Sequence, residues 1–172
     1  LTTGDYYNSG GEREDPVEAA RWYRKAADRG YKEAQYLIAV FYHRGRGVAQ
    51  DHKRALNWYR KAADGGEAKG LAGLAELYED GTGVKQDGAL AVELYRKCAG
   101  AGLNRCLGAL GRVYHEGKVV KKDPVEAYYW YAKAQAAGEE WVKTKLDALT
   151  DEMTLQELNE GIRRVQAERE AR

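Results

Sequence analysis

The chain has 172 residues, which suits one domain of ordinary size, or one repeat array, with enough apolar content for a core. Its 28 basic and 27 acidic residues give a net charge of +1, and this balance offers no electrostatic case for binding nucleic acid or an anionic membrane surface. No apolar run approaches the roughly 20 residues of a membrane span, so membrane insertion is not expected. Leu1 is not a natural start, and we therefore expect a mature or trimmed product.

The sequence repeats with a period of 36 residues, which we follow as columns of matching positions. Four segments read DPVEAARWYRKAADRG, DHKRALNWYRKAADGG, DGALAVELYRKCAGAG and DPVEAYYWYAKAQAAG, and they begin at Asp15, Asp51, Asp87 and Asp123. A second segment repeats in step as AQYLIAVFYHRGRGV, GLAGLAELYEDGTGV and CLGALGRVYHEGKVV. The opening GDYYNSGG keeps the register with Tyr6 and Gly11, which indicates the end of an earlier, incomplete unit.

Each unit is predicted to form two helices. The Asp column supplies N-caps, and in DPVE a proline takes the first helical position while a glutamate completes a capping box. The first helix runs about 14 residues to the column of Gly30, where a positive φ can end it. A second helix follows, at 32–44 in the first full unit. Such paired helices cannot bury their apolar faces alone, so we predict an all-α protein, an α-solenoid (right-handed superhelix), whose gaps Trp22, Trp58 and Trp130 fill.

The period stops after Thr150. The segment TLQELNEGIRRVQAERE predicts one more helix, which Thr154 and Glu157 begin as a capping box. A stripe at helical spacing follows: Leu155, Leu158, Ile162 and Val165. We therefore expect a repeat array over 1–149, with a partial first unit and units starting at 15, 51, 87 and 123. A C-terminal capping helix over 150–172 follows; the alternative is a helix that docks on a partner.

The repeat resembles the Sel-1-like repeat family, which is related to tetratricopeptide repeats. The shared pattern is A-x-x-x-L-G-x-x-Y-x-x-G-x-G-V-x-x-D-x-x-x-A-x-x-W-Y-x-K-A-A-x-x-G, and it covers nearly all of residues 2–149. The chain departs from it at Leu94, which replaces Trp, at Val119, which replaces the second Gly, and in the final WVKTKLDALT. The resemblance implies a protein-interaction module rather than a particular chemistry.

The two cysteines, Cys98 and Cys106, fall in columns that hold small residues. Those residues are Ala26, Ala62 and Ala134 in the first column, and Ala34, Gly70 and Val142 in the second. Since the columns flank the Gly102 hairpin, they should face each other, which favours a disulfide over two independent thiols. The resemblance adds that one branch of secreted bacterial members carries a cysteine pair at this spacing. A lasting disulfide implies a periplasmic or secreted protein, with a cytoplasmic protein as the alternative.

Catalysis is not expected. The only serine is Ser9, in a glycine-rich loop, and S-x-x-K is missing. The chain therefore lacks the nucleophile for the penicillin binding or hydrolysis ascribed to some cysteine-rich members of the family, although a cell-wall or β-lactam hydrolase is kept as an alternative. Cys106 and His115 lie nine positions apart on one helix, and so on opposite faces.

No metal or cofactor is expected either. The histidines are interpreted as surface residues: His43, His52 and His115. The first and the third share a column two units apart, too far to hold one metal ion. Glu76, Glu79 and Asp80 gather on one helical face, where a solvated or partner-facing acidic patch is favoured over an acid/base pair or a calcium site.

Binding is expected along the second helices, whose varying columns share one face. Similarity to tetratricopeptide arrays implies that this face lines a concave groove. We name it the second-helix stripe; it comprises Glu33, Tyr36, Val40, His43, Arg44, Lys69, Ala72, Glu76, Glu79, Asp80, Arg105, Gly108, Arg112, His115 and Glu116. Its middle unit is acidic and its third is basic, which suits a peptide or partner helix of mixed charge.

Three hypotheses follow. The leading one is a non-enzymatic module, an exported bacterial adaptor or host-interaction protein that binds a peptide or protein partner on the second-helix stripe. The second is a cell-wall or β-lactam hydrolase. The third is a cytosolic signalling scaffold with reduced thiols.

Overall fold

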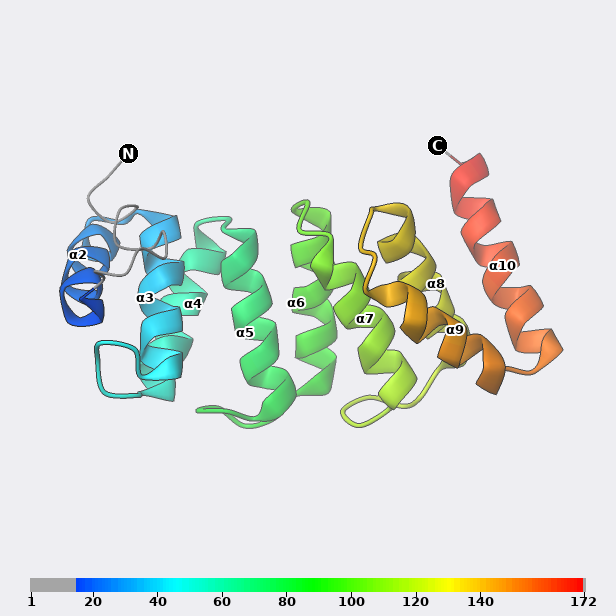
Figure 1. Cartoon of the computed structure of the whole chain (residues 1–172), viewed down its shortest axis with the longest axis horizontal. Helices are drawn as coiled ribbons and strands as arrows, with labels where there is room; N and C mark the ends of the chain where they lie inside the picture. The colour runs from blue at the N-terminus through cyan, green and yellow to red at the C-terminus, as the bar shows by residue number, and fades with distance from the viewer. Residues whose placement is uncertain (1–14, 172) are drawn as a thin grey trace. The chain divides into compact units, whose positions relative to one another are not determined.

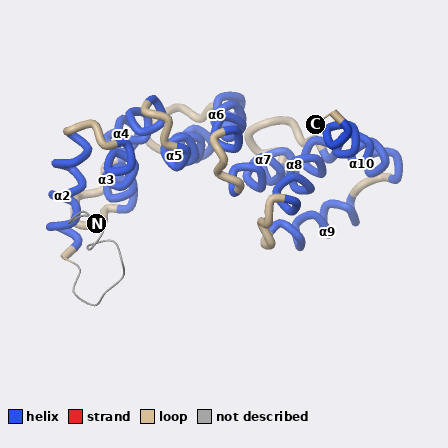
Figure 2. Tube along the Cα trace, turned by 90° about the horizontal axis from the view of Figure 1, so that it is seen from above, coloured by secondary structure: helices blue, strands red, loops and turns tan. Residues whose placement is uncertain are grey.

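The computed structural model describes residues 15–171 of the chain. These residues form nine helices and no strand (Figure 2). The helices are α2 (Pro16–Asp28), α3 (Lys32–Arg44), α4 (His52–Asp64), α5 (Ala68–Asp80), α6 (Gly88–Gly100), α7 (Arg105–Glu116), α8 (Pro124–Ala136), α9 (Val142–Glu152) and α10 (Leu155–Glu170). The chain divides into two compact units, unit 1 (Leu1–Gln86) and unit 2 (Asp87–Arg172).

The helices begin and end at the predicted cap residues. The side chain of each aspartate in the Asp column accepts a hydrogen bond from a backbone N–H of the first turn; these residues are Asp15, Asp51, Asp87 and Asp123. The second helices α3, α5 and α7 end at Gly45, Gly81 and Gly117, which adopt φ values of 67°, 70° and 64°. A side chain at these positions would be strained, so the glycines end the helices for a backbone reason.

Helices that follow one another in the sequence pack together within each unit. In unit 1, α3 packs on α2 and α4, and α5 packs on α4; in unit 2, α7 packs on α6 and α8, and α9 packs on α8 (Figure 1). A tyrosine lies at the centre of every first helix with 3% or less of its surface exposed: Tyr23, Tyr59, Tyr95 and Tyr131. The predicted fold class, an all-α solenoid of helix pairs, is confirmed.

A hydrogen bond between an arginine and a tyrosine recurs in three successive helix pairs. The guanidinium of Arg24 donates to the hydroxyl of Tyr42 at 3.3 Å, and the same bond joins Arg60 to Tyr78 at 3.1 Å. In unit 2, Arg96 donates to Tyr114 at 3.2 Å. The fourth pair has Ala132 and Thr150 at these positions, so it cannot form the bond.

The two helices of a pair approach closely at the cysteine columns. In the second pair, a Cβ placed on Gly70 would lie 2.7 Å from the Cβ of Ala62, which is closer than real Cβ atoms come. In the third pair the same columns hold Cys98 and Cys106, whose Sγ atoms are 2.03 Å apart, at bonding distance, with the Cα atoms separated by 6.1 Å. The predicted pairing is confirmed.

The loops after α3, α5 and α7 lie across the start of the first helix of the same pair. A Cβ on Gly47 would meet the carbonyl oxygen of Pro16 at 2.0 Å. In the third pair, where Val119 replaces this glycine, the residue at the start of the helix is itself a glycine, Gly88, and a Cβ there would lie 2.1 Å from the Val119 carbonyl oxygen. The departure at Val119 is therefore matched by a small residue on the other side of the contact.

The tryptophans differ in their exposure. Trp58 is buried, as expected of a residue that fills a gap between helices. The same expectation is wrong for Trp22, which is 39% exposed and carries the ammonium group of Lys25 over its ring at 4.8 Å. Trp130 is half-buried.

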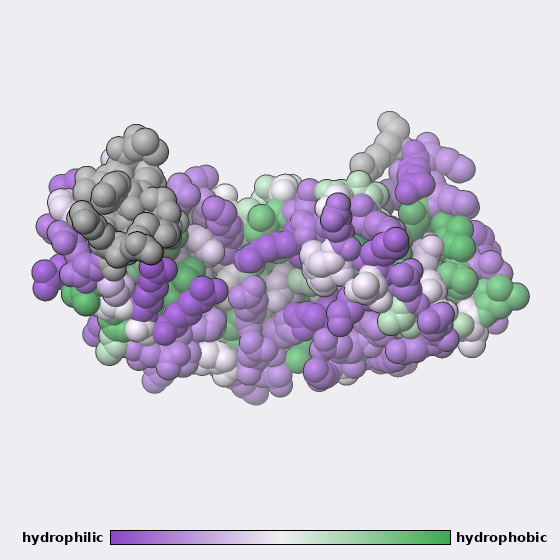
Figure 3. Space-filling model, in the orientation of Figure 1, coloured by the Kyte–Doolittle hydropathy of each residue, from purple (hydrophilic) through white to green (hydrophobic). Residues whose placement is uncertain are grey.

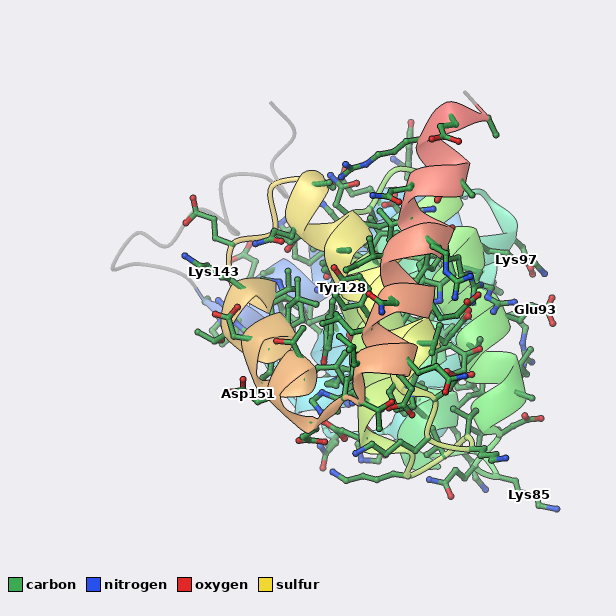
Figure 4. The ribbon with its side chains drawn as sticks, turned by 90° about the vertical axis from the view of Figure 1, so that its right-hand side faces the viewer. Lys85, Glu93, Lys97, Tyr128, Lys143 and Asp151 are labelled. Atoms are coloured by element: carbon green, nitrogen blue, oxygen red, sulfur yellow. A yellow bond between two sulfur atoms is a disulfide. The ribbon has the colours of Figure 1, made fainter. Side chains whose placement is uncertain are left out.

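α10 packs on α8 (Figure 1). It begins with the predicted capping box, in which Thr154 and Glu157 exchange hydrogen bonds. Leu155 is 75% exposed, and Figure 3 shows apolar atoms gathered over this helix. Gly161 is buried against Tyr128, which lies between α9 and α10 (Figure 4). The boundary at 149/150 and the capping role of the last helix stay predictions.

Candidate functional site

The residues of the second-helix stripe lie on α3, α5 and α7, and their exposure varies. Six are exposed: Glu33, Arg44, Lys69, Asp80, Arg105 and Glu116. Tyr36, Val40, His43, Glu76, Arg112 and His115 are half-buried. Ala72, Glu79 and Gly108 are buried. The charged residues of the stripe are therefore presented to solvent unevenly.

In unit 1 the structure brings three of these residues together across two second helices. Lys69 on α5 lies with its Nζ 4.0 Å from the Oε1 of Glu33 on α3. The same ammonium group lies 5.8 Å from the centre of the Tyr36 ring, which in turn is 6.1 Å from the Tyr59 ring of α4. A charged pair thus borders an aromatic ring that is partly open to solvent.

The column of His43 packs toward a first helix. The His43 ring lies 5.5 Å from the His52 ring and 6.2 Å from the Tyr59 ring. Burial, with the nearby His52 and Arg44, lowers the pKa of His43, so the neutral imidazole is favoured. The Nδ1 atom of His52 is buried without a hydrogen-bond partner. These two histidines are therefore packing residues more than freely solvated ones, which differs from the surface interpretation.

Glu79, which lies in the same column as His43, differs from the predicted acidic patch. Glu79 was expected to be solvated or partner-facing, but it is only 9% exposed. Its counterparts pack on first helices, as His43 does in unit 1 and as His115 does in unit 2, where its ring lies 6.1 Å from that of Tyr131. Asp80 next to it remains exposed.

In unit 2 the basic residues of the stripe have acidic neighbours. Arg112 lies 3.7 Å from the carboxylate of Glu116, which also accepts from Lys118 at 2.9 Å. The bond from Lys118 and the nearby Arg112 lower the pKa of Glu116, so this carboxylate stays ionised. His115 lies 3.5 Å from the carboxylate of Glu152 on α9. The local charge is therefore more balanced than the sequence of α7 indicates.

Trp141 is a candidate that the sequence analysis missed. It is 46% exposed, and its ring covers Gly108, where a Cβ would lie 2.4 Å from the ring. Its indole N–H donates to Glu139 at 2.8 Å. The signal was present, because one more period of 36 from Arg105 reaches this position.

No metal site emerges from residues 15–171. Among them, no three side chains of His, Cys, Asp and Glu type gather as ligands for one metal ion. The partial first unit with Tyr6 and Gly11, and the single serine Ser9, lie outside the described residues. A search of the same described helices for a membrane-crossing segment found none of sufficient length and apolar character.

Repeated helix pairs with a shared 36-residue period define a helical repeat protein. The Sel1 repeat model matches residues 3–31, 32–67, 68–103 and 106–138, so the chain belongs to the Sel1 repeat family. Sel1 repeats are protein-interaction modules, and this type of fold is typically a non-catalytic scaffold. The expected family is confirmed.

Solved structures of the family are similar to this chain. A Sel1 repeat protein from Oxalobacter formigenes is 33% identical over 83% of the chain with a TM-score of 0.76. The protective antigen c5321 of uropathogenic Escherichia coli is 38% identical over 81%, with a TM-score of 0.72. Helicobacter pylori cysteine rich protein B is 25% identical over 77%, with a TM-score of 0.56, and is covered over 96% of its own length.

The chain spans only part of the first two of these proteins, 59% of the Oxalobacter protein and 30% of c5321. A comparison with curated proteins finds no match.

Proposed function

We propose that this protein is a non-enzymatic adaptor that binds a peptide or protein partner along the second-helix stripe. The observation that carries the proposal is an aromatic ring, partly open to solvent and bordered by charges, on the stripe positions of each unit. In unit 1 this ring is Tyr36, beside Lys69 and Glu33. In unit 2 it is Trp141, which lies on Gly108 one period after Arg105.

The residue types support this choice. Tyr, Trp and Arg are the side chains that most often dominate the binding energy of protein interfaces. Tyr and Trp do so because they bury large areas with few rotatable bonds. The surrounding charges suit a partner of mixed charge, since complementary charges speed association and select against wrong partners.

A crosslinking pulldown from the native cell tests the binding surface. The chain with Trp141→Ala, and separately the chain with Arg105→Glu and Arg112→Glu, is expected to lose the captured partner, whereas the wild type retains it. Lys121→Glu in an exposed loop of the same unit is the matched charge control and should capture normally. Thermal unfolding of each variant verifies that it is folded. Undiminished capture by folded variants of both kinds would refute the assignment.

We further propose that the protein is exported. The pairing of Cys98 with Cys106 would persist in an oxidising compartment. Two structures of the family point the same way by their descriptions, one as a protective antigen and one as a cysteine rich protein. Thiol titration of the unreduced, denatured protein from the native cell tests this; two free thiols would favour a cytosolic scaffold instead.

A further inference from the structure

α8 binds α10 through two charged residues of α10 that lie four positions apart, Arg164 and Glu168. The Glu168 carboxylate of α10 accepts from the Nζ of Lys133 at 2.9 Å and from the hydroxyl of Tyr129 at 2.7 Å. One helical turn earlier, Arg164 donates to Glu126, and its guanidinium lies 4.5 Å from the centre of the Tyr129 ring. α8 therefore recognises one face of a helix by one acidic and one basic side chain.

α4 offers the same positions two repeat periods earlier, with different charges. Glu126, Tyr129, Trp130 and Lys133 of α8 correspond to Arg54, Asn57, Trp58 and Lys61 of α4. Together with Arg24 of α2, these four residues of α4 line a shallow cavity of about 340 Å³ in unit 1; we name this set the Trp58 patch. Trp58 forms the buried floor, and the other four side chains are exposed.

The cations of the Trp58 patch converge on one ring. The guanidinium of Arg24 lies 5.1 Å from the centre of the Trp58 ring, and the ammonium group of Lys61 lies 4.4 Å from it. Arg24 pairs with Asp28 at 3.0 Å, and Arg54 pairs with Asp51 at 3.3 Å. Three cations therefore share two carboxylates, and the patch keeps an excess of positive charge.

Lys61 differs from the lysines of its column in unit 2. Lys97 has a carboxylate partner on its own helix, Glu93, at 2.7 Å, and Figure 4 labels both residues. Lys133 has Glu168 of α10. Within residues 15–171, no carboxylate pairs with Lys61, because Asn57 stands where Glu93 stands on α6.

We propose that the Trp58 patch is a second docking surface, which binds an acidic amphipathic helix of another protein with two carboxylates four residues apart. One carboxylate takes the place of Glu168 and binds Lys61, with the Asn57 amide as a second donor. The other takes the place of Arg164 and binds Arg54. The surface lies on first helices and is separate from the second-helix stripe, so it goes beyond the proposed function.

A second copy of this chain does not fit the Trp58 patch. Its α10 would bring Arg164 against Arg54, and two like charges at this contact repel each other. Arg54 stands at the position that Glu126 has in α8. A helix that binds the Trp58 patch therefore needs a carboxylate where α10 has Arg164.

The test uses the full chain and labelled synthetic peptides in a fluorescence anisotropy titration. The first peptide has the sequence of residues 154–170 with Arg164→Glu, which gives two carboxylates four residues apart; the second has the unaltered sequence. We expect the first peptide to bind at least about tenfold more tightly, because opposite charges replace a like-charge contact. The Arg54→Glu chain should reverse this preference and bind the unaltered peptide more tightly.

The controls separate this surface from the stripe and from general charge effects. Lys85→Glu, an exposed change outside the patch, should leave the preference intact, and so should Trp141→Ala. Equal binding of the two peptides, or no reversal by Arg54→Glu, would overturn the proposal. Concentration-dependent dimers of the chain that dissociate on Lys61→Glu, measured by sedimentation, would also overturn it in favour of a second copy.

Discussion

At the scale of single residues, the central tyrosine of each first helix has little free space around it. Tyr131 is 1% exposed, and its ring fills the space beside Gly111, where a Cβ would lie 2.4 Å from a ring carbon. Burial disfavours the phenolate and raises the pKa of Tyr131 to about 12, with nearby Arg112 opposing the change. The hydroxyl proton of this residue is therefore linked to the stability of unit 2.

We predict that Tyr131→Phe makes stability less sensitive to alkaline pH. The unfolded chain releases the proton near pH 10 and the folded chain near pH 12. The stabilisation is therefore complete below pH 10 and is lost as the pH rises toward 12. Between those values the wild type should lose up to about 2 to 3 kcal/mol more than Tyr131→Phe, as measured by denaturant unfolding.

Tyr31→Phe is the control for this experiment, because Tyr31 is 64% exposed and should leave the wild-type pH dependence unchanged. Identical slopes for the wild type and Tyr131→Phe would show that this hydroxyl does not govern the alkaline loss.

At the scale of helices, one buried carboxylate joins three of them. Glu126 on α8 is 6% exposed, and it accepts from Arg96 of α6 at 3.2 Å, from the indole of Trp130 at 2.9 Å, and from Arg164 of α10. A buried carboxylate is tolerated only when such donors compensate its lost hydration. The same group therefore positions α10 and neutralises the arginines around it.

Glu126→Gln should loosen α10 while leaving it helical. The neutral amide cannot pair with two cations, and bonds to charged groups are worth about 1.5 to 3 kcal/mol. We expect hydrogen exchange of the α10 amides to quicken by about tenfold or more, measured by mass spectrometry. Exchange in α3 should not change.

Glu160→Gln is the control for that variant, since Glu160 is exposed and pairs with Arg163 on its own helix. If both variants raised the hydrogen-exchange rate of the α10 amides equally, the contact of Glu126 with α10 would not be what stabilises this helix.

The helices themselves could be predicted from the sequence, because their signals are local. Asp51 and Gly45 act within one turn of their own position, and the repeat multiplies each signal. The position of α10 on α8 could not be predicted. The ion pair between Lys133 and Glu168 joins a residue of the repeat to a residue of the last helix, which lies outside the repeat. The burial of Glu79 was also missed, because the pattern of residues along one helix does not give the exposure of a side chain in the packed structure.

At the scale of the whole chain, the repeats are alike in fold but differ in whether a disulfide links the two helices of a pair. Only unit 2 has the link between Cys98 and Cys106; the same columns of unit 1 hold Ala and Gly. The family and the fold were therefore evident from the period, whereas the proposed binding surfaces rest on residues that differ between repeats, such as Trp141 and Arg54. Residues shared by all repeats indicate the fold, and residues that differ between repeats are the candidates for binding.

Reduction of the disulfide is predicted to destabilise one half of the chain. Opening so short a loop should cost about 2 to 3 kcal/mol, because the unfolded chain regains conformational freedom. Hydrogen exchange of the intact and the reduced chain should show lower protection in α6 and α7 and little change in α2 and α3. A chain with Cys98→Ala and Cys106→Ala should not respond to the reductant, and equal losses in both units would contradict the prediction.

The contact between Gly88 and Val119 limits how such repeats can be recombined. In the first pair the small residue belongs to the loop, at Gly47, and the larger one, Pro16, begins the helix; in the third pair the order is reversed. A chimera that grafts the Val119 loop beside Pro16 would bring the side chain at the helix start against the backbone carbonyl of the loop. Evolution or engineering must therefore shuffle each loop together with the helix start beneath it, so the inherited module is a matched set of contacts and not a stretch of 36 residues cut at any convenient point.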